Sequence, residues 1–288
     1  MDVEVTVALS VHDSEKCIHS CIESLLAQTN GSFEILVVED PPFDRTQEMI
    51  NVFQDKRIRY FRNQRHLGIP GTRNKCIELA KGNYIFFTDD DCVVSRDWIE
   101  QGLKFLAKLG SVGVEGKTYY VCETYKPGHS DEVVENKKGG QFMTCNMAYK
   151  KRLLESVGGF DERFDYHEDR DLGLRASRLG RIYFNPKMVV CHRKKTLNPV
   201  QFVRTGERIK NRVLLYKRFK ERSLFVGRIA YPLDLMAMIF PPLILGSFFR
   251  NGYRTREDIN LFPFIYIKLV YERFNLWKMC AKERVFLL

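Results

Sequence analysis

Three consecutive carboxylates, Asp89, Asp90 and Asp91, stand directly after an apolar run that ends at position 88. Adjacent carboxylates repel one another, so such a run costs free energy unless a cation is shared between them. Oxygen donors of this kind suit a hard divalent ion, Mg²⁺ or Mn²⁺, which can also bind a diphosphate. The alternative is a solvated turn that caps the helix expected from residue 98. The pattern favours the metal site.

A second acidic group, Glu168 and Asp169, opens a predicted helix. The helix dipole stabilises carboxylates in a first turn, so capping is the alternative to a chemical role. The chemical role is that of a general base, because an attacking hydroxyl group must give its proton to an acceptor such as a carboxylate. Glu168 lies 77 positions after Asp91, so only the fold can bring the two acidic groups together.

Apolar runs and helical periodicities alternate along the first two thirds of the chain. Strands are predicted at 3–11, 33–38, 58–61, 83–88, 112–121 and 182–192, and helices at 14–28, 46–53, 72–80, 98–108, 153–157 and within 165–180. This alternation predicts an α/β fold with a mainly parallel sheet. Ligands bind such sheets at the carboxyl ends of the strands. Positions 10–13, 39–40 and 89–91 follow predicted strands and are therefore candidates for the site.

The net charge of +10 is unevenly distributed along the 288 residues. Residues 193–288 contain 20 Lys and Arg against 7 Asp and Glu, a net charge of +13, whereas residues 1–192 carry −3. A basic third of this kind indicates an anionic partner, either a membrane surface or nucleic acid. A solvated basic helix is the alternative.

The basic third also contains apolar segments. Residues 199–220 predict an amphipathic helix, and residues 231–249 are apolar except for Asp234 and Ser247 but are interrupted by prolines. A spanning helix needs about 20 apolar residues, so the interrupted segment fits a re-entrant or interfacial position better. The alternative is a soluble helical subdomain that buries these faces.

The cysteines and the N-terminus predict the compartment. The eight cysteines are scattered and form no CxxC pair, so neither a zinc ribbon nor a thioredoxin-like site is expected. The N-terminal residues show no signal-peptide pattern. Together these features predict a reduced, cytosolic compartment.

Seven short motifs occur in order along the chain: VALSVHD (7–13), FEILVVED (33–40), LG with TRN (67–74), GNYIFFTDDD (82–91), NMA (146–148), VGGFDERF (157–164) and ED with DL and R (168–175). Each motif is weak alone, but their order and spacing together resemble the family 2 glycosyltransferases of the GT-A fold, from about residue 5 to about residue 192. The resemblance implies a Rossmann-like catalytic domain with a mainly parallel central sheet over residues 1–195. Its nucleotide-sugar half would cover about 1–95 and its acceptor half about 96–195. Residues 196–288 would form a basic, largely helical membrane-association region.

The resemblance also implies where a nucleotide-sugar donor binds. His12 would stack on the base, Asp40 would hydrogen-bond it, and the first two aspartates of the triplet would reach the ribose. The implied donor-binding residues are Ser10, His12, Asp40, Arg73, Asn74, Asp89 and Asp90. Several residues near the base depart from the family pattern, such as the two prolines after Asp40. The base therefore stays open among uracil, guanine and thymine, with a UDP-sugar as the preferred donor.

The resemblance implies the metal ligands and the catalytic base in the same way. Asp91, together with Asp89 and His192, would hold Mn²⁺ or Mg²⁺, although a histidine at a strand end can also be purely structural. Asp169 falls at the position of the family's catalytic base, and Glu168 stands beside it. One displacement assisted by a base inverts the anomeric carbon, so an inverting enzyme is expected.

The expected function is therefore metal-dependent transfer of a sugar from a nucleotide-diphosphate sugar to a hydroxyl or phosphate group. The acceptor would be a lipid-linked or surface glycan, met at the inner face of the cell membrane with which the enzyme is peripherally or monotopically associated. Under this function, nucleic acid is not a partner. One alternative function is that of a basic nucleic-acid-binding protein. A nucleotidyltransferase is another, but it would need a glycine-rich phosphate loop, and residues 10–16 contain no glycine.

Overall fold

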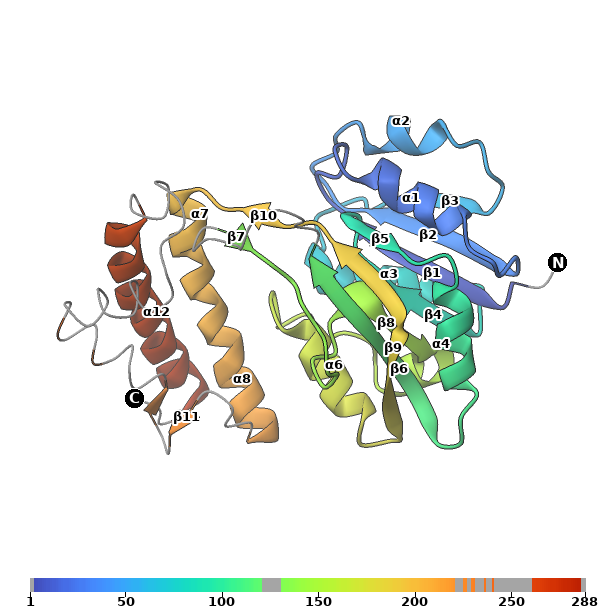
Figure 1. Cartoon of the computed structure of the whole chain (residues 1–288). Coiled ribbons are helices and arrows are strands. Elements are labelled where there is room, and N and C mark those ends of the chain that lie inside the picture. The colour runs from blue at the N-terminus through green and yellow to red at the C-terminus, as the bar shows by residue number, and fades with distance from the viewer. Residues whose placement is uncertain are drawn as a thin grey trace. The chain divides into compact units, whose positions relative to one another are not determined.

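The computed structural model describes residues 3–120, 131–220 and 261–285, together with 225–226, 229–230, 236 and 240. The chain divides into two compact units. Figure 1 shows the whole chain, coloured by residue number. The first unit is Met1–Val121 with Val134–Arg193, and the second is Cys122–Val133 with Lys194–Leu288. The apolar segment singled out at 231–249 lies outside the described residues, apart from Met236 and Phe240.

The first unit is built on an eight-stranded sheet with the order β3-β2-β1-β4-β8-β6-β9-β5. Its strands are β1 (Val5–Val11), β2 (Phe33–Glu39), β3 (Ile58–Arg62), β4 (Tyr84–Phe87), β5 (Cys92–Val94), β6 (Ser111–Tyr120), β8 (Met147–Lys150) and β9 (Arg181–His192). β1 to β4 run parallel, as do β6 and β9, whereas β8 and β5 run against their neighbours. The mainly parallel α/β sheet expected from the sequence is confirmed.

Helices cover both faces of this sheet. Residues of β1 alternate between two apolar clusters, with Val7 and Leu9 in one and Ala8 in the other, because successive side chains of a strand point to opposite faces. The first cluster includes α1 (Ile18–Leu26), α2 (Thr46–Asn51) and α4 (Trp98–Leu106), and the second includes α3 (Gly68–Leu79), α5 (Lys151–Ser156) and α6 (Glu168–Ala176). The near-continuous apolar runs of the central strands follow from this burial on both faces.

Two details of the first unit differ from the prediction. α3 begins at Gly68, four residues before the expected start at Thr72, and it takes in Pro70. A proline is tolerated in the first turn of a helix, where its missing N–H would have no partner within the helix. The short strands β5 and β8 were not predicted, because three or four residues carry too little periodicity.

The second unit is largely helical in its described part. It contains α7 (Pro199–Arg204), a 3₁₀ turn (Thr205–Arg208), α8 (Ile209–Phe219) and α12 (Phe262–Glu283). Short strand pairs join β7 (Asp131–Glu132) to β10 (Lys195–Thr196) and β11 (Phe225–Val226) to β12 (Ile229–Ala230). The single helix expected over 199–220 is thus interrupted by the 3₁₀ turn. Among the described helices, none combines the length and apolarity that crossing a bilayer requires.

Candidate active site

A cavity of about 540 Å³ lies in the first unit at the carboxyl ends of the parallel strands. The strands β1, β4 and β9 end there, and the turn between β4 and β5 supplies the aspartate triplet. Eight of the expected site residues line the cavity: Ser10, His12, Asp40, Arg73, Asp89, Asp90, Asp91 and His192. The cavity thus lies at the edge of the sheet that the general rule for open α/β sheets indicates.

The pairing of β5 with β9 brings His192 to the acidic turn. Cys92, the first residue of β5, pairs with His192, the last residue of β9. His192 Nε2 lies 3.4 Å from Asp91 Oδ1 and 3.8 Å from Asp89 Oδ2. Cys92 Sγ lies 3.9 Å from the same oxygen of Asp91. A strand pairing that joins residues 100 positions apart thus forms this group.

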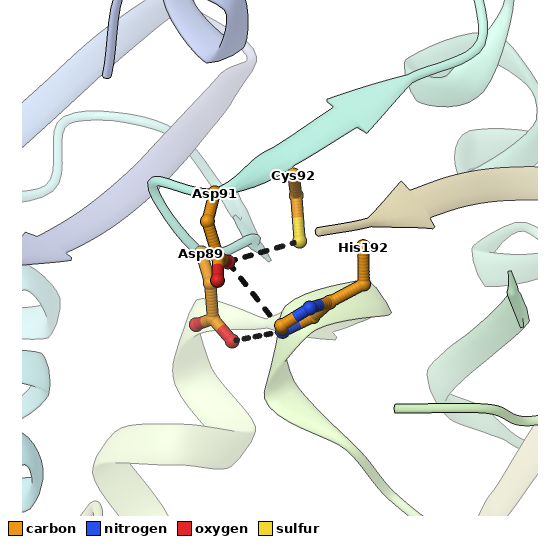
Figure 2. A group of neighbouring side chains, drawn as sticks. All are labelled: Asp89, Asp91, Cys92 and His192. Atoms are coloured by element: carbon orange, nitrogen blue, oxygen red, sulfur yellow. Dashed lines mark hydrogen bonds and ion pairs between the residues drawn. The ribbon is translucent and has the colours of Figure 1, made fainter. Parts of the chain in front are cut away.

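These four side chains converge on one point, as Figure 2 shows. One donor atom from each of Asp89, Asp91, Cys92 and His192 lies within 4.8 Å of the others. Two carboxylates and an imidazole are donors that Mn²⁺ accepts, and the carboxylates suit Mg²⁺ as well. The donor set therefore fits the divalent ion that the family resemblance implies.

The electrostatics of the triplet also fit a cation. Burial raises the pKa of Asp91 to about 6, with the charges of Asp89 and Asp90 adding to the effect and His192 opposing it. Burial would raise the pKa of Asp89 too, but the nearby His192 and the charge of Arg73 hold it below its usual value. Negative charge is thus concentrated where a divalent ion would relieve the repulsion.

Arg73 connects this group to helix α6. Its guanidinium donates to Asp89 Oδ1 over 3.0 Å and forms an ion pair with Glu168. The Arg73 and Glu168 side chains are only 8% and 9% exposed, so both charges depend on this pairing. Glu168 is therefore held by Arg73, rather than directed at the cavity, whose lining does not include it.

Asp169 is the next residue of α6 and does not line the cavity itself. Its carboxylate accepts a hydrogen bond of 2.6 Å from the N–H of Arg170. Burial raises the pKa of Asp169 to about 7, the charge of Glu168 adds to this, and Arg73 opposes it. A carboxylate with a pKa near neutrality is suited to accepting a proton from a hydroxyl group.

Asp40 lies at the cavity but is already heavily hydrogen-bonded. It accepts hydrogen bonds from the N–H groups of Leu67 and Gly68, each over 2.9 Å, and from Asn63 over 2.8 Å. These bonds outweigh its burial and keep the pKa of Asp40 below its usual value. Asp40 therefore fixes the turn that opens α3, and the exposed His66 ring lies against it at 2.6 Å.

Asn74 is the one expected donor-binding residue outside the cavity lining. Its side chain accepts from the N–H of Phe160 over 2.7 Å and donates to the Phe160 carbonyl over 2.9 Å. These bonds fasten α3 to the turn that contains Gly159. By contrast, Asp90 lines the cavity and accepts a hydrogen bond of 3.3 Å from the Cys17 thiol.

Two residues of the site were not singled out from the sequence. Cys92 follows the triplet directly. Its place next to Asp91, at the start of a short strand, is the sequence feature that could have revealed it. His66 lies against Asp40 and near the His12 ring, with the two ring centroids 6.0 Å apart. Nothing in the local sequence marks His66, because only the turn before α3 brings it to Asp40.

The model of one family, glycosyl transferase family 2, matches residues 6–162 of the chain. The chain is 28% identical over 171 residues to the UDP-Glc:alpha-D-GlcNAc-diphosphoundecaprenol beta-1,3-glucosyltransferase WfaP of Escherichia coli, a match that covers 59% of this chain and 68% of WfaP. It is 25% identical over 199 residues to the amylovoran biosynthesis glycosyltransferase AmsB of Erwinia amylovora, covering 62% of this chain and 65% of AmsB.

Solved structures share the fold. The structure of S. aureus TarS 1-349 in complex with UDP-GlcNAc matches with a TM-score of 0.57 and 16% identity, covering 98% of this chain and 92% of that one. The mannosyltransferase PcManGT from Pyrobaculum calidifontis, in complex with GDP-Man and Mn2+, matches with a TM-score of 0.56 and 14% identity, covering 96% and 73%. At these identities the likeness concerns the fold.

Proposed function

The chain belongs to glycosyl transferase family 2 and has the GT-A fold, and on that premise we propose that it transfers a sugar from a nucleotide-diphosphate sugar to a lipid-linked or surface-glycan acceptor, with inversion. The observation that carries the proposal is the cavity at the strand ends. It joins the aspartate triplet and His192 to Arg73, and through Arg73 to the acidic start of α6. Leaving-group stabilisation and proton acceptance would thus depend on one connected network.

A UDP-sugar is the proposed donor and a polyprenyl-linked glycan the proposed acceptor. The name of WfaP specifies UDP-Glc and a diphosphoundecaprenol acceptor, and TarS has been solved with UDP-GlcNAc. PcManGT has been solved with GDP-Man, so proteins of this fold bind donors with either uracil or guanine as the base. Ser10, His12 and the neighbouring His66 line the cavity where the base would lie.

Asp89, Asp91 and His192 are the residues that would hold Mn²⁺ or Mg²⁺. When bound, such an ion neutralises charge that develops on the diphosphate leaving group. Arg73 keeps one oxygen of Asp89 engaged and leaves the other facing His192. The protein thereby orients this carboxylate without help from a ligand.

Asp169 is the proposed base. It would accept the proton of the acceptor hydroxyl as that oxygen attacks the anomeric carbon, and a single displacement of this kind inverts the configuration. Glu168 is then a positioning residue, because its ion pair with Arg73 holds the first turn of α6 against the donor side of the cavity. The two adjacent carboxylates would have different tasks because only one of them is paired with the arginine.

We further propose that the catalytic domain covers residues 1–195 and that residues 196–288 attach the enzyme to the inner, cytoplasmic face of the cell membrane. The support is the net charge of +13 over residues 193–288, which complements anionic lipid. Such attachment would bring the cavity to the surface where a lipid-linked acceptor lies.

A binding screen tests donor and metal together. Calorimetry with UDP-, GDP- and dTDP-sugars, each with and without Mn²⁺, is expected to show one base bound preferentially and only with the ion present. In His192→Ala, Mn²⁺ affinity should fall about tenfold or more, since losing even an outer partner of a metal ligand costs 10- to 100-fold. His19→Ala, at an exposed histidine of α1 in the same unit and outside the cavity lining, is the matched control. Metal-independent binding in the unaltered protein would contradict the metal assignment.

A further inference from the structure

Helix α12 presents an apolar side to solvent. Ile267, Val270, Phe274 and Trp277 are 48%, 41%, 60% and 44% exposed. Their spacings of three, four and three residues place them in one line along the helix. A surface helix of a soluble domain normally shows charged and polar residues on its exposed side. Scattered exposed apolar residues are ordinary, but a continuous line of them over several turns indicates a contact surface.

The opposite side of α12 is fixed against α8, beside which it lies in Figure 1. Leu276 and Cys280 are buried in a cluster with Ile209 and Val213 of α8. Lys217 of α8 also forms an ion pair of 2.8 Å with Glu283 near the end of α12. The helix is therefore held in one rotational setting, and its apolar line faces outward because the other side is already occupied.

Basic residues continue the exposed side where the apolar line ends. Lys278, Lys282 and Arg284 are all exposed and follow Trp277 within two turns. Trp277 thus stands between an apolar stretch and a cationic one. Tryptophan is enriched at the interface between hydrocarbon and lipid headgroups, where apolar and cationic contacts are both available.

We propose that the line Ile267–Val270–Phe274–Trp277 inserts into the surface of an anionic lipid bilayer, with α12 lying in the plane of the membrane. The inference rests on the proposed function, which places a lipid-linked acceptor in reach, and it names the surface that docks. Charge complementarity selects lipid over a second copy of this chain. Another copy would bring the same excess of 20 basic over 7 acidic residues, and the two basic regions would repel.

The first test is vesicle binding by the full-length chain and a triple variant, V270S/F274Q/W277Q. The unaltered chain should co-sediment with phosphatidylglycerol-containing vesicles and much less with pure phosphatidylcholine. The triple variant should need at least tenfold more anionic lipid for half-maximal binding. The control V52S/L109Q/L179Q removes exposed apolar side chains from the first unit and should bind as the unaltered chain does. Equal binding by the two triple variants would overturn the proposal.

Charge variants test the same surface without removing apolar side chains. In K278E/K282E the affinity for anionic vesicles should fall by about fivefold or more for each lysine, since a basic residue near such a surface contributes about that factor. Circular dichroism of each variant confirms that the helices remain formed. Unchanged vesicle affinity in K278E/K282E would contradict the proposed orientation of α12.

Tryptophan fluorescence gives a direct readout of insertion. The chain has two tryptophans, and Trp98 is fully buried, so a change on adding lipid reports Trp277. Its emission should shift to shorter wavelength with anionic vesicles, and lipids brominated on their acyl chains should quench it. The absence of both effects would overturn the proposal. So would a dimer in analytical ultracentrifugation that dissociates in V270S/F274Q/W277Q.

Nucleotide binding keeps the two proposals separable. Donor binding belongs to the cavity of the first unit, whereas vesicle binding belongs to α12. If the unaltered chain binds vesicles but no nucleotide sugar, the proposed function fails and the docking surface stands. If it binds a nucleotide sugar but no anionic vesicle, the docking surface fails and the glycosyltransferase proposal stands.

Discussion

The cavity of the first unit and helix α12 of the second depart in opposite ways from the rule that apolar residues lie inside and charged ones outside. At the cavity, Arg73, Glu168 and Asp89 are charged and largely buried, and each has an opposite charge within reach. On α12, apolar side chains such as Phe274 face solvent while Arg273 is 5% exposed. Each departure costs free energy in the isolated protein.

The two departures indicate two kinds of ligand. The buried paired charges, with the aspartate triplet beside them, suit a cation and a diphosphate, because fixed opposite charges can stabilise both. An exposed apolar line ending in lysines suits a lipid surface, which offers hydrocarbon and negative headgroups together. Under the two proposals, chemistry belongs to the first unit and attachment to the second.

The strongest test of the proposed active site is Asp169→Asn, because it removes the proposed base. The amide cannot accept the proton of the attacking hydroxyl, so turnover should fall about 10³-fold, within the range typical of a lost general base. Affinity for the nucleotide sugar should be unchanged, because Asp169 does not line the cavity. Transfer kinetics and calorimetry measure the two quantities. Near-normal turnover would show that another group is the base.

Next in size is the loss of the buried arginine. Arg73→Met leaves Glu168 buried without its partner, which should lower the free energy of unfolding by about 3 kcal/mol. The double variant R73M/E168Q should recover part of this loss, because the uncompensated charge is gone. Urea denaturation followed by Trp98 fluorescence in a Trp277→Phe background reports the first unit alone. Equal stability of R73M and the parent would mean that the buried charges are not coupled.

The pH dependence is a smaller, graded effect. Burial and the charge of Glu168 raise the pKa of Asp169 to about 7 in the folded protein. Below that pH the base is increasingly protonated, so turnover should fall about tenfold per pH unit as the pH decreases. Glu168→Gln removes a nearby negative charge, which lowers the pKa of Asp169 and should move the profile to lower pH. A profile of Glu168→Gln displaced to higher pH would contradict the coupling.

The smallest expected effect belongs to Asn74. Its hydrogen bonds to the Phe160 backbone should contribute about 1 kcal/mol each, so Asn74→Ala should lower the free energy of unfolding by about 1–2 kcal/mol. The KM for the donor should stay essentially unchanged if the residue only fastens α3 to the Gly159 turn. A large rise in KM with unchanged stability would instead support the donor contact that the family resemblance implies.

Much of the first unit could be predicted because its signals are local. The strand β2 contains four consecutive apolar residues, and α1 repeats its apolar residues at helical spacing, so neighbouring residues suffice to recognise them. The acidic groups could be nominated because they follow strand ends or open a helix. β5 and the early start of α3 escaped because three residues, or a Gly-Ile-Pro-Gly segment, carry no distinctive period.

The sequence alone was enough to predict the sheet, the edge at which the cavity lies and the acidic residues available there. Their spatial grouping came from the tertiary structure. The β5–β9 pairing adds Cys92 to the acidic group, Arg73 occupies Glu168 and leaves Asp169 without that partner, and packing on α8 turns the apolar side of α12 outward. The reason is that local periodicity specifies which face of an element is apolar, whereas packing and charge pairing between distant segments decide what that face meets.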